Sequence, residues 1–433
     1  MAVIVKIVVA GGGFAGCAAA LQAARMGASV VLAERTDMLC GTGAVGGIMR
    51  NNGRYTAAEE MTAMGGGQLF SLIDRHCRHK NIDFPGHKHA SLFDVARVPA
   101  KTEQYLEDAG VKISLMSRIT AAFHLWKESS SGKYRLMSVK DSRGNILEAD
   151  AFVDATGSAG PGSICRKYGN GCASCIMRCP TFGGRQSLCA LCGIDEFGAV
   201  RDGQIGAMSG SCKLMKDSLS EELSRQLTQN GVAVVKIPQS LMEDHRDMKA
   251  CQQYALPEYA ANIVLLDTGH AKMMTPYFPL QKLRKIPGLE NARYEDPYSG
   301  GTGNSIRLTA CVRRADTMLV DGMENLFCAG EKSGIFVGHT EAIVTGVLAG
   351  YNAVRCARGE ALAVLPEETA CGDAIHWVGE QMKTPEGRSY KYTFSGSVLF
   401  ERMKALGLYT ADLKEIRRRV EKCGAADLFQ KDA

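Results

Sequence analysis

The sequence of 433 residues lacks the features of an exported or membrane-embedded protein. Its first residues, MAVIVKIVVAGGG, contain no basic start and no small-residue cleavage site after a long apolar core, so we expect no signal peptide. The stretch Ile7–Ala24 has no charged residue, but three successive glycines and Gln22 interrupt it. A strand, a turn and a helix account for it better than a membrane span. We therefore expect a cytoplasmic protein without a membrane segment.

The sequence also lacks a strong excess of charge of either sign, whereas cysteine is abundant. The net charge of +5 is compatible with a polyanionic partner but does not require one. Without an export signal, the 16 cysteines are expected to be reduced, so clustered cysteines indicate metal binding or redox chemistry rather than a disulfide framework. The length allows two or three domains with a large core.

The segment VKIVVAGGGFAGCAAALQAARMGASVVLAE has the order strand, glycine turn, helix, strand. Its G-x-G-x-x-G pattern permits a tight turn, close approach of a pyrophosphate to the backbone, and close helix–strand packing. The helix dipole places its positive end under the phosphates. Glu34 follows the second strand, where a carboxylate accepts hydrogen bonds from ribose hydroxyls. A glycine-rich turn without a ligand is the less favoured alternative. The cofactor-binding residues predicted here are Gly11, Gly13, Phe14, Ala15, Gly16, Glu34 and Arg35.

Two later segments favour FAD over NAD as the dinucleotide. An apolar strand precedes Ala155-Thr156-Gly157, a pattern that closes the dinucleotide domain of many flavoproteins. Another strand precedes Gly330-Glu331, and a long helix rich in small residues begins near Thr340. The N-terminus of that helix is expected at the flavin ring, where negative charge develops on reduction. A second complete G-x-G-x-x-G unit, which NAD(P)H binding would need, is lacking.

These elements predict an α/β fold with a Rossmann-like, three-layer FAD-binding domain that is discontinuous in sequence. Between the two anchors, ITAAFHLWKESSSGKYRLMSVKDSRGNILEADAFVDATG alternates short apolar strands with turns and predicts a β-meander. The predicted domains are the first part of the FAD-binding domain (1–160), a cysteine-rich insert and substrate domain (161–319), the second part of the FAD-binding domain (320–360) and a helical C-terminal tail (361–433).

In these motifs, and in the glycine-rich segment LCGTGAVGGI, the chain resembles FAD-dependent oxidoreductases of the glutathione-reductase-like superfamily. The segments IPGLENA and MENLFCAGEKSGIFVGHTEAIVTGVLAGYNA are similar to the GidA/MnmG and TrmFO branch, flavoproteins that modify uridines in tRNA. The resemblance implies that Gly330, Glu331, Gly338 and Glu341 belong to the flavin-proximal motif. It also places Cys40 near a cysteine that this branch uses close to the flavin.

Five cysteines are clustered between residues 172 and 192. The segment CASCIMRCP matches the last three cysteines of the bacterial ferredoxin run, and a further cysteine nearby would complete a [4Fe–4S] site. Two C-x2-C pairs alternatively match a zinc site, and a thiol–disulfide centre is a third interpretation. We favour the iron–sulfur cluster because it offers a flavin a one-electron exit. The predicted ligands are Cys172, Cys175, Cys179, Cys189 and Cys192, with Cys165 as another fourth-ligand candidate.

Three residues are catalytic candidates. Cys40, in the glycine-rich flavin loop, is either a thiol that reacts with the flavin or a small buried residue. His339 is either a general acid–base or a residue that lines the start of the following helix. Glu341 is the third candidate, through the resemblance.

Together these features predict an FAD-dependent oxidoreductase that passes electrons between flavin and a substrate, with the cysteine segment as a second redox centre. The expected partner is a small-molecule substrate or a redox partner protein, and a homodimer is compatible with the sequence. One alternative is a flavoenzyme that modifies uridines in tRNA or rRNA, in which basic residues of the tail (Arg417–Arg419) contact RNA. A packed helical cap with a solvated face is the favoured interpretation of this tail. Another alternative is a flavin-binding protein with structural zinc.

Overall fold

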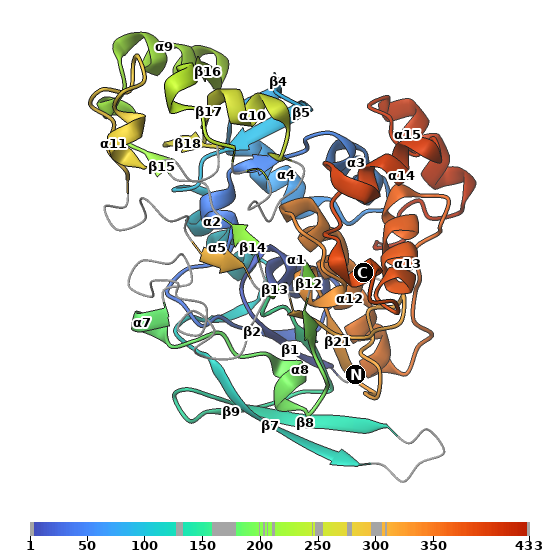
Figure 1. Ribbon diagram of the computed structural model, residues 1–433. Coiled ribbons are helices and arrows are strands. Elements are labelled where there is room, and N and C mark those ends of the chain that lie inside the picture. The colour runs from blue at the N-terminus through green and yellow to red at the C-terminus, as the bar shows by residue number, and fades with distance from the viewer. Residues whose placement is uncertain are drawn as a thin grey trace.

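The computed structural model has a five-stranded parallel sheet near its centre, with the order β21-β10-β1-β2-β6 (Figure 1). The strands are β1 (Lys6–Ala10), β2 (Ser29–Ala33), β6 (Lys112–Ser114), β10 (Ala151–Asp154) and β21 (Leu326–Cys328). Because β21 pairs with β10, two distant parts of the sequence complete one sheet, as the interrupted motif predicted. The structure describes residues 4–126, 133–157, 179–198, 200–201, 204–205, 207–209, 213–244, 246, 254–274, 279–295, 305–307 and 310–430.

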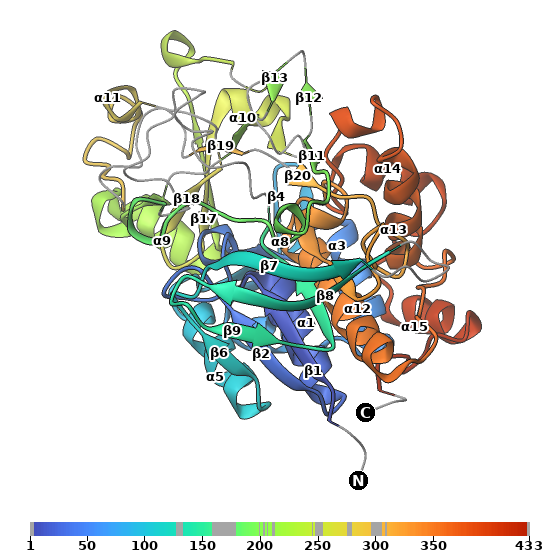
Figure 2. The ribbon, with the colours of Figure 1, turned by 90° about the horizontal axis from the view of Figure 1, so that it is seen from below.

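The two faces of this sheet are buried in different hydrophobic cores. Along β1, Ile7 and Val9 pack into the core on one face, whereas Val8 and Ala10 belong to the core on the other face, as the alternation of a strand requires. The first face is covered by α1 (Phe14–Arg25), α5 (Val98–Asp108) and α12 (His339–Arg358). The second is covered by β7 (Ile119–Trp126), β8 (Tyr134–Asp141), β9 (Ile146–Glu148) and α8 (Leu188–Leu191) (Figure 2). The three-layer fold with its meander is therefore confirmed.

Helices α1 and α12 approach each other very closely through small residues. A Cβ atom added to Gly346 would lie 2.2 Å from the Ala15 carbonyl oxygen, and one added to Gly350 would lie 2.2 Å from that of Ala19. The spacing of four residues on each helix keeps these positions on one face. The close contact brings the start of α12 next to the glycine-rich turn before α1.

Two smaller sheets and their helices lie at the top of Figure 1, beside the parallel sheet. A four-stranded sheet of order β15-β18-β17-β16 packs against two helices, and a three-stranded sheet of order β3-β5-β4 shares a core with it. These elements are β3 (Ile48–Met49), β4 (Cys77–Phe84), β5 (His87–Phe93), β15 (Lys213–Leu214), α9 (Glu221–Asn230), β16 (Val232–Lys236), α10 (Pro257–Ala261), β17 (Asn262–Asp267), β18 (Ala271–Met273) and α11 (Leu280–Leu283).

The tail is helical, as predicted, and its helices α13 and α15 pack on α3 at the right of Figure 1. Ile416 and Val420 form the buried face of α15. Arg419, expected at an RNA-facing or solvated surface, instead donates to the buried carboxylate of Glu60 at 3.1 Å. The helices are α3 (Gly53–Ala63), α4 (Gln68–Arg75), α13 (Ala370–Gln381), α14 (Ser397–Ala405) and α15 (Leu413–Lys422).

Short elements complete the described chain: α2 (Gly43–Gly46), α7 (Cys179–Phe182), β11 (Phe197–Gly198), β12 (Val200–Arg201), β13 (Gln204–Ile205), β14 (Ala207–Ser209), β19 (Ser305–Arg307) and β20 (Ala310–Cys311). Among the residues that the structure describes, none of the helices is both long enough and apolar enough to cross a bilayer.

Candidate functional site

The turn between β1 and α1 gives each glycine of the G-x-G-x-x-G pattern a different role. Gly11 has φ +101°, and a Cβ atom there would lie 2.5 Å from the Ala155 carbonyl oxygen. A Cβ atom on Gly16 would lie 1.8 Å from the Gly11 carbonyl oxygen, so this position permits helix and strand to touch. Gly13 is the opposite case, because a Cβ atom there would meet nothing within 4 Å and no side chain caps the helix. The open space therefore lies where the backbone would face a pyrophosphate.

The carboxylate of Glu34 lies against this turn. One oxygen accepts from the Gly12 N–H at 2.6 Å, and the other accepts from the backbone and hydroxyl of Thr36 at 2.7 and 2.9 Å. Glu34 is thus fixed at the end of β2, where the motif expects the ribose-binding acid. Its neighbour Arg35 donates to the Gly183 carbonyl at 2.5 Å. These positions fit a dinucleotide, and they join the turn to the segment after the meander.

The end of β10 is organised by Asp154, a residue that sequence reasoning did not single out. Its carboxylate is fully buried and accepts from the backbone and hydroxyl of Thr156 at 3.0 and 2.7 Å. Its second oxygen accepts from the Ser187 hydroxyl at 3.2 Å and the Cys189 N–H at 2.8 Å. Ala155 and Thr156 are thereby held over Gly11, and Gly157 follows with φ +72°.

Residues Gly330 and Glu331, at the end of β21, lie beside α1. The Gly330 N–H donates to the Thr345 hydroxyl at 2.8 Å, and a Cβ atom on Gly330 would lie 3.1 Å from the Ala15 side chain. Glu331 is 9% exposed and is the second residue of the short 3₁₀ turn Gly330–Ser333, which leads toward α12. The two glycine motifs predicted from separate segments therefore meet in space.

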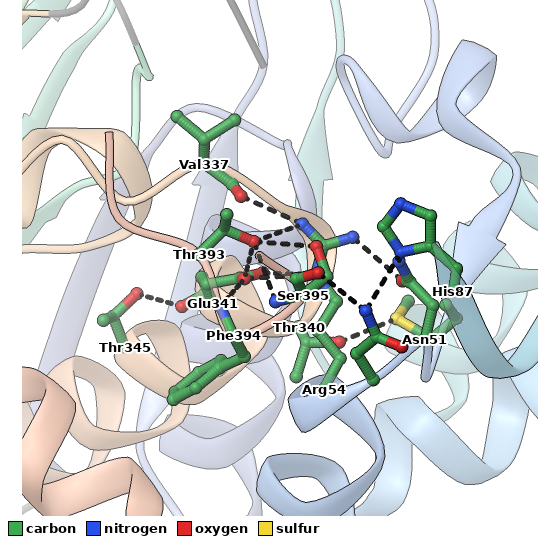
Figure 3. A network of polar contacts seen from close by, with 12 residues as sticks. Asn51, Arg54, His87, Val337, Thr340, Glu341, Thr345, Thr393, Phe394 and Ser395 are labelled. Atoms are coloured by element: carbon green, nitrogen blue, oxygen red, sulfur yellow. Dashed lines mark hydrogen bonds and ion pairs between the residues drawn. The ribbon is translucent and has the colours of Figure 1, made fainter. Parts of the chain in front are cut away.

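Glu341, in the first turn of α12, forms a buried ion pair with Arg54 of α3 (Figure 3). Their side chains are 4% and 0% exposed, and the Arg54 Nε atom lies 3.1 Å from each oxygen of Glu341. Glu341 also accepts from the Thr393 hydroxyl at 2.7 Å and the Phe394 N–H at 2.8 Å. Four donor contacts therefore occupy this carboxylate, and two of them come from the tail.

The remaining N–H groups of Arg54 donate to residues from three segments of the chain. Its guanidinium donates to the Asn51 side-chain oxygen at 3.1 Å, the Val337 carbonyl at 3.0 Å and the Thr393 hydroxyl at 2.9 Å. Asn51 in turn contacts Nδ1 of His87 at 3.0 Å (Figure 3). A single network thus links α3, β5, the start of α12 and the tail.

His339 is the first residue of α12 and is packed among aromatic rings. Its ring centroid lies 5.3 Å from that of Phe14 and 5.9 Å from that of Phe93, both in edge-to-face geometry. A Cβ atom on Gly46 would lie 1.7 Å from its Nε2 atom, so the glycine-rich loop passes directly against the imidazole. The structure therefore brings together Phe14, His339 and the loop that follows β2.

Cys40 lies in the same loop with φ +71° and 1% exposure. Its N–H donates to the Gly12 carbonyl at 2.8 Å, and the Cys17 thiol contacts the same carbonyl at 3.2 Å. A hydrogen bond with Cys40, together with burial, raises the pKa of the Cys17 thiol well above its usual range. Two neighbouring thiols therefore lie behind the glycine turn, although only Cys40 was predicted from the sequence. Cys17 stands inside the GGGFAGC segment, which could have signalled its position.

The cysteine-rich segment is described only in part. Cys172 and Cys175 lie outside the described residues, and only the backbone of Cys179 is described, at the start of α7. Cys189 and Cys192 pack in the apolar core under the meander. Burial raises the pKa of the Cys189 thiol well above its usual range and that of the Cys192 thiol to about 12.

Within the described part of the chain, no three metal-binding side chains come together. The iron–sulfur and zinc interpretations of the segment therefore stay predictions.

The model of the family "Glucose inhibited division protein A" matches residues 6–275 and 269–361 of this chain. Among solved structures, GidA from Aquifex aeolicus (form II crystal) superposes with a TM-score of 0.65 at 16% identity, covering 99% of this chain and 74% of that one. Form I of the same protein gives a TM-score of 0.58 at 15% identity, with coverage of 97% and 79%.

Curated relatives match over shorter segments. A methylenetetrahydrofolate–tRNA-(uracil-5-)-methyltransferase TrmFO from Exiguobacterium sp. is 36% identical over 112 residues, which are 25% of this chain and 23% of the relative. A TrmFO from Bacillus mycoides is 32% identical over 144 residues, or 32% of this chain and 29% of the relative. The matched segments thus span less than a third of these relatives.

Proposed function

The chain belongs to the glucose inhibited division protein A family, and from this premise we propose that it is an FAD-dependent enzyme that modifies uracil in tRNA. The TrmFO relatives, named for transfer of a one-carbon unit from methylenetetrahydrofolate to uracil in tRNA, support this substrate class. We prefer it to electron transfer through a cysteine-bound cluster, because the family and the TrmFO relatives both favour the tRNA-modifying class.

The observation that carries the proposal is the open glycine turn beside the start of α12. The N–H groups around Gly13 would bind the pyrophosphate, and Glu34 would accept hydrogen bonds from the ribose hydroxyls. Ala155, Thr156, Gly157, Gly330 and Gly338 would line the cofactor with their backbone. When bound, FAD would supply hydride or electron-pair transfer.

The ring of the cofactor would lie near the start of α12, whose positive dipole end favours the negative charge of the reduced form. His339 presents its imidazole there, half-buried, beside Phe14 and the glycine-rich loop. We assign it the role of holding or moving a proton at the substrate base. Glu341, saturated by Arg54 and the tail, holds the first turn of α12 in place rather than exchanging protons.

Cys40 is the proposed nucleophile, because it lies in the loop that passes His339 and its thiol is a stronger nucleophile than any hydroxyl nearby. Cys40→Ala is expected to abolish uridine modification while bound flavin is retained. Cys17→Ala is the matched control, since it removes the adjacent buried thiol and should leave modification largely intact. Equal loss in both variants would contradict a specific role of Cys40.

The decisive experiment compares two measurements. The purified protein should show the two visible absorption bands of oxidised flavin, and nucleoside analysis of tRNA from a deletion strain should show one uracil modification missing. Restoring the wild-type chain should return it. A colourless full-length protein would overturn the cofactor assignment, and unchanged tRNA in the deletion strain would overturn the substrate assignment.

A further inference from the structure

A pocket of about 670 Å³ opens between the β4–β5 hairpin and the C-terminal tail. None of its lining residues belongs to the glycine turn or to the start of α12. Its volume lies within the range of small-molecule sites, and its lining combines aromatic rings with polar and charged side chains. The lining residues are Asn52, Asp83, Phe84, Gly86, His87, Lys88, His89, Phe400 and Tyr409.

Aromatic rings reach this pocket from two distant parts of the chain. On the hairpin, the rings of Phe84 and His87 lie 4.7 Å apart, and on the tail those of Phe400 and Tyr409 lie 5.1 Å apart in edge-to-face geometry. Phe400 and Tyr409 are only partly buried, so each leaves part of its ring accessible. Partly exposed rings around one cavity are suited to stacking against a flat ligand.

The rim of the pocket carries charged side chains of both signs. Lys88 is exposed at the rim, and the ammonium group of Lys404 lies 4.9 Å from the Phe400 ring centroid. Asp83 lies on the same hairpin, and burial together with this carboxylate raises the pKa of Tyr409. Lys404 is paired with Glu401 at 2.8 Å, so Lys88 is the cation at the rim that favours an anionic group, and the Asp83 carboxylate can accept a hydrogen bond from a ring N–H.

The hairpin turn at the pocket is held rigidly. The Asn52 amide donates to the carbonyls of Gly86 and Ser395 at 3.0 and 2.9 Å, and its oxygen accepts from the Lys88 N–H at 2.8 Å. Asn52 and His89 have φ of +54° and +60°, a conformation that costs residues with side chains free energy and is concentrated at functional sites. These residues with strained backbone lie where the β4–β5 hairpin meets the C-terminal tail.

We propose that this pocket binds a nucleotide, with its base stacked on the Phe400 ring, beside the Tyr409 ring that stands edge-to-face to it, and with its phosphate near Lys88. The inference rests on the proposed function and extends it, since the nucleotide is either free or part of an RNA strand. A flat base suits an aromatic ring, a phosphate suits Lys88, and Asp83 suits a ring N–H of the base. The residues that line this pocket differ from those proposed to hold the flavin.

The test is equilibrium binding by the full-length, flavin-loaded protein, with uridine monophosphate and a fluorescent oligouridylate as probes. Lys88→Glu and Phe400→Ala are each expected to weaken binding about tenfold. Lys101→Glu is the matched control, because it reverses the charge of another exposed lysine, on α5, and should leave affinity unchanged. Since Lys88 has an exposed side chain, its variant retains the fold even if Phe400→Ala does not.

Each outcome is decisive. Oligouridylate binding far tighter than that of the mononucleotide supports an RNA strand as the source, and equal binding supports a free nucleotide. No binding of either probe, or equal weakening by the Lys101 control, overturns the proposal. Flavin absorbance and tRNA modification are measured in parallel. The assignment of tRNA as the substrate can then fail while nucleotide binding is still observed, and nucleotide binding can fail while tRNA is still modified.

Discussion

Two helix N-termini lie at the candidate site, and the surroundings of their N-cap glycines differ. Before α1, an added Cβ atom on Gly13 would meet nothing within 4 Å. Before α12, one on Gly338 would lie 2.0 Å from Glu341 and 2.1 Å from Arg54. The Cβ side of the first N-cap is open, whereas that of the second is filled by the protein's own charges. The two termini therefore differ in what surrounds the N-cap residue: α1 leaves room for a ligand there, whereas side chains of the protein fix the start of α12.

A third terminus sharpens the comparison. At the start of α13, the buried carboxylate of Glu60 accepts from the N–H groups of Ala370 and Cys371, both at 3.0 Å. Here an acidic side chain from α3 takes the position that a phosphate would take at α1. Of the two N-cap glycines compared above, Gly13 is the one with open space on its Cβ side.

The largest effect is expected from breaking the filled terminus at α12. Arg54→Ala leaves the Glu341 carboxylate fully buried without its cation, and should lower the free energy of unfolding by about 3–5 kcal/mol. Urea denaturation measures this loss. Arg97→Ala is the control, because its side chain is 76% exposed beside Asp94, and should cost less than about 1 kcal/mol. Similar losses in both variants would mean that the buried pair does not hold the site together.

A smaller effect is expected at the open terminus. Gly13→Ala places a methyl group in free space, so thermal unfolding of the flavin-free protein should stay unchanged. Flavin affinity should fall about tenfold, or about 1.4 kcal/mol, because the methyl group occupies the approach of the pyrophosphate. Flavin fluorescence titration measures the change. Gly16→Ala is the contrasting variant, since its Cβ atom would clash with Gly11 and prevent folding. Unchanged flavin affinity in Gly13→Ala would refute the phosphate position.

The smallest effect concerns pH and the third terminus. Burial raises the pKa of Glu60 above its ordinary value of 4.5, although the N–H donors and Arg419 oppose the shift. The folded state therefore binds this proton more tightly than the unfolded state, and stability falls as pH rises from about 4.5 through the raised pKa. Glu60→Gln should flatten that part of the stability profile, as measured by denaturation across the range. A slope that persists in the variant would assign it to another group.

The sequence predicted the parts of the site that depend on local backbone rules. Gly11, Gly13 and Gly16 could be assigned because a turn between a strand and a helix needs them in that order. The partners of the catalytic candidates could not be assigned in this way. Arg54 and Glu341 are 287 residues apart, and only the folded chain brings them together. Asp154 and Cys17 were missed for the same reason, since their importance lies in what they contact.

The domain boundaries proposed from the sequence divide a hydrophobic core that no local sequence pattern reveals. Strands β4 and β5 lie within the first predicted part of the FAD-binding domain, but Phe84 and Leu92 share a core with Val264 and Leu266 of the insert. Apolar alternation predicts that a strand has a buried face, but not which surface covers it. The boundaries at 160, 319 and 360 therefore stay proposals.

The contacts from Thr393 and Phe394 to Glu341 also bear on how the protein is made. During synthesis, the glycine turn and the parallel strands β1, β2, β6 and β10 leave the ribosome long before these tail residues do. Until residues 393–394 arrive, the buried carboxylate lacks two of its four donor contacts. The start of α12 therefore reaches its full set of contacts only after these tail residues have been made.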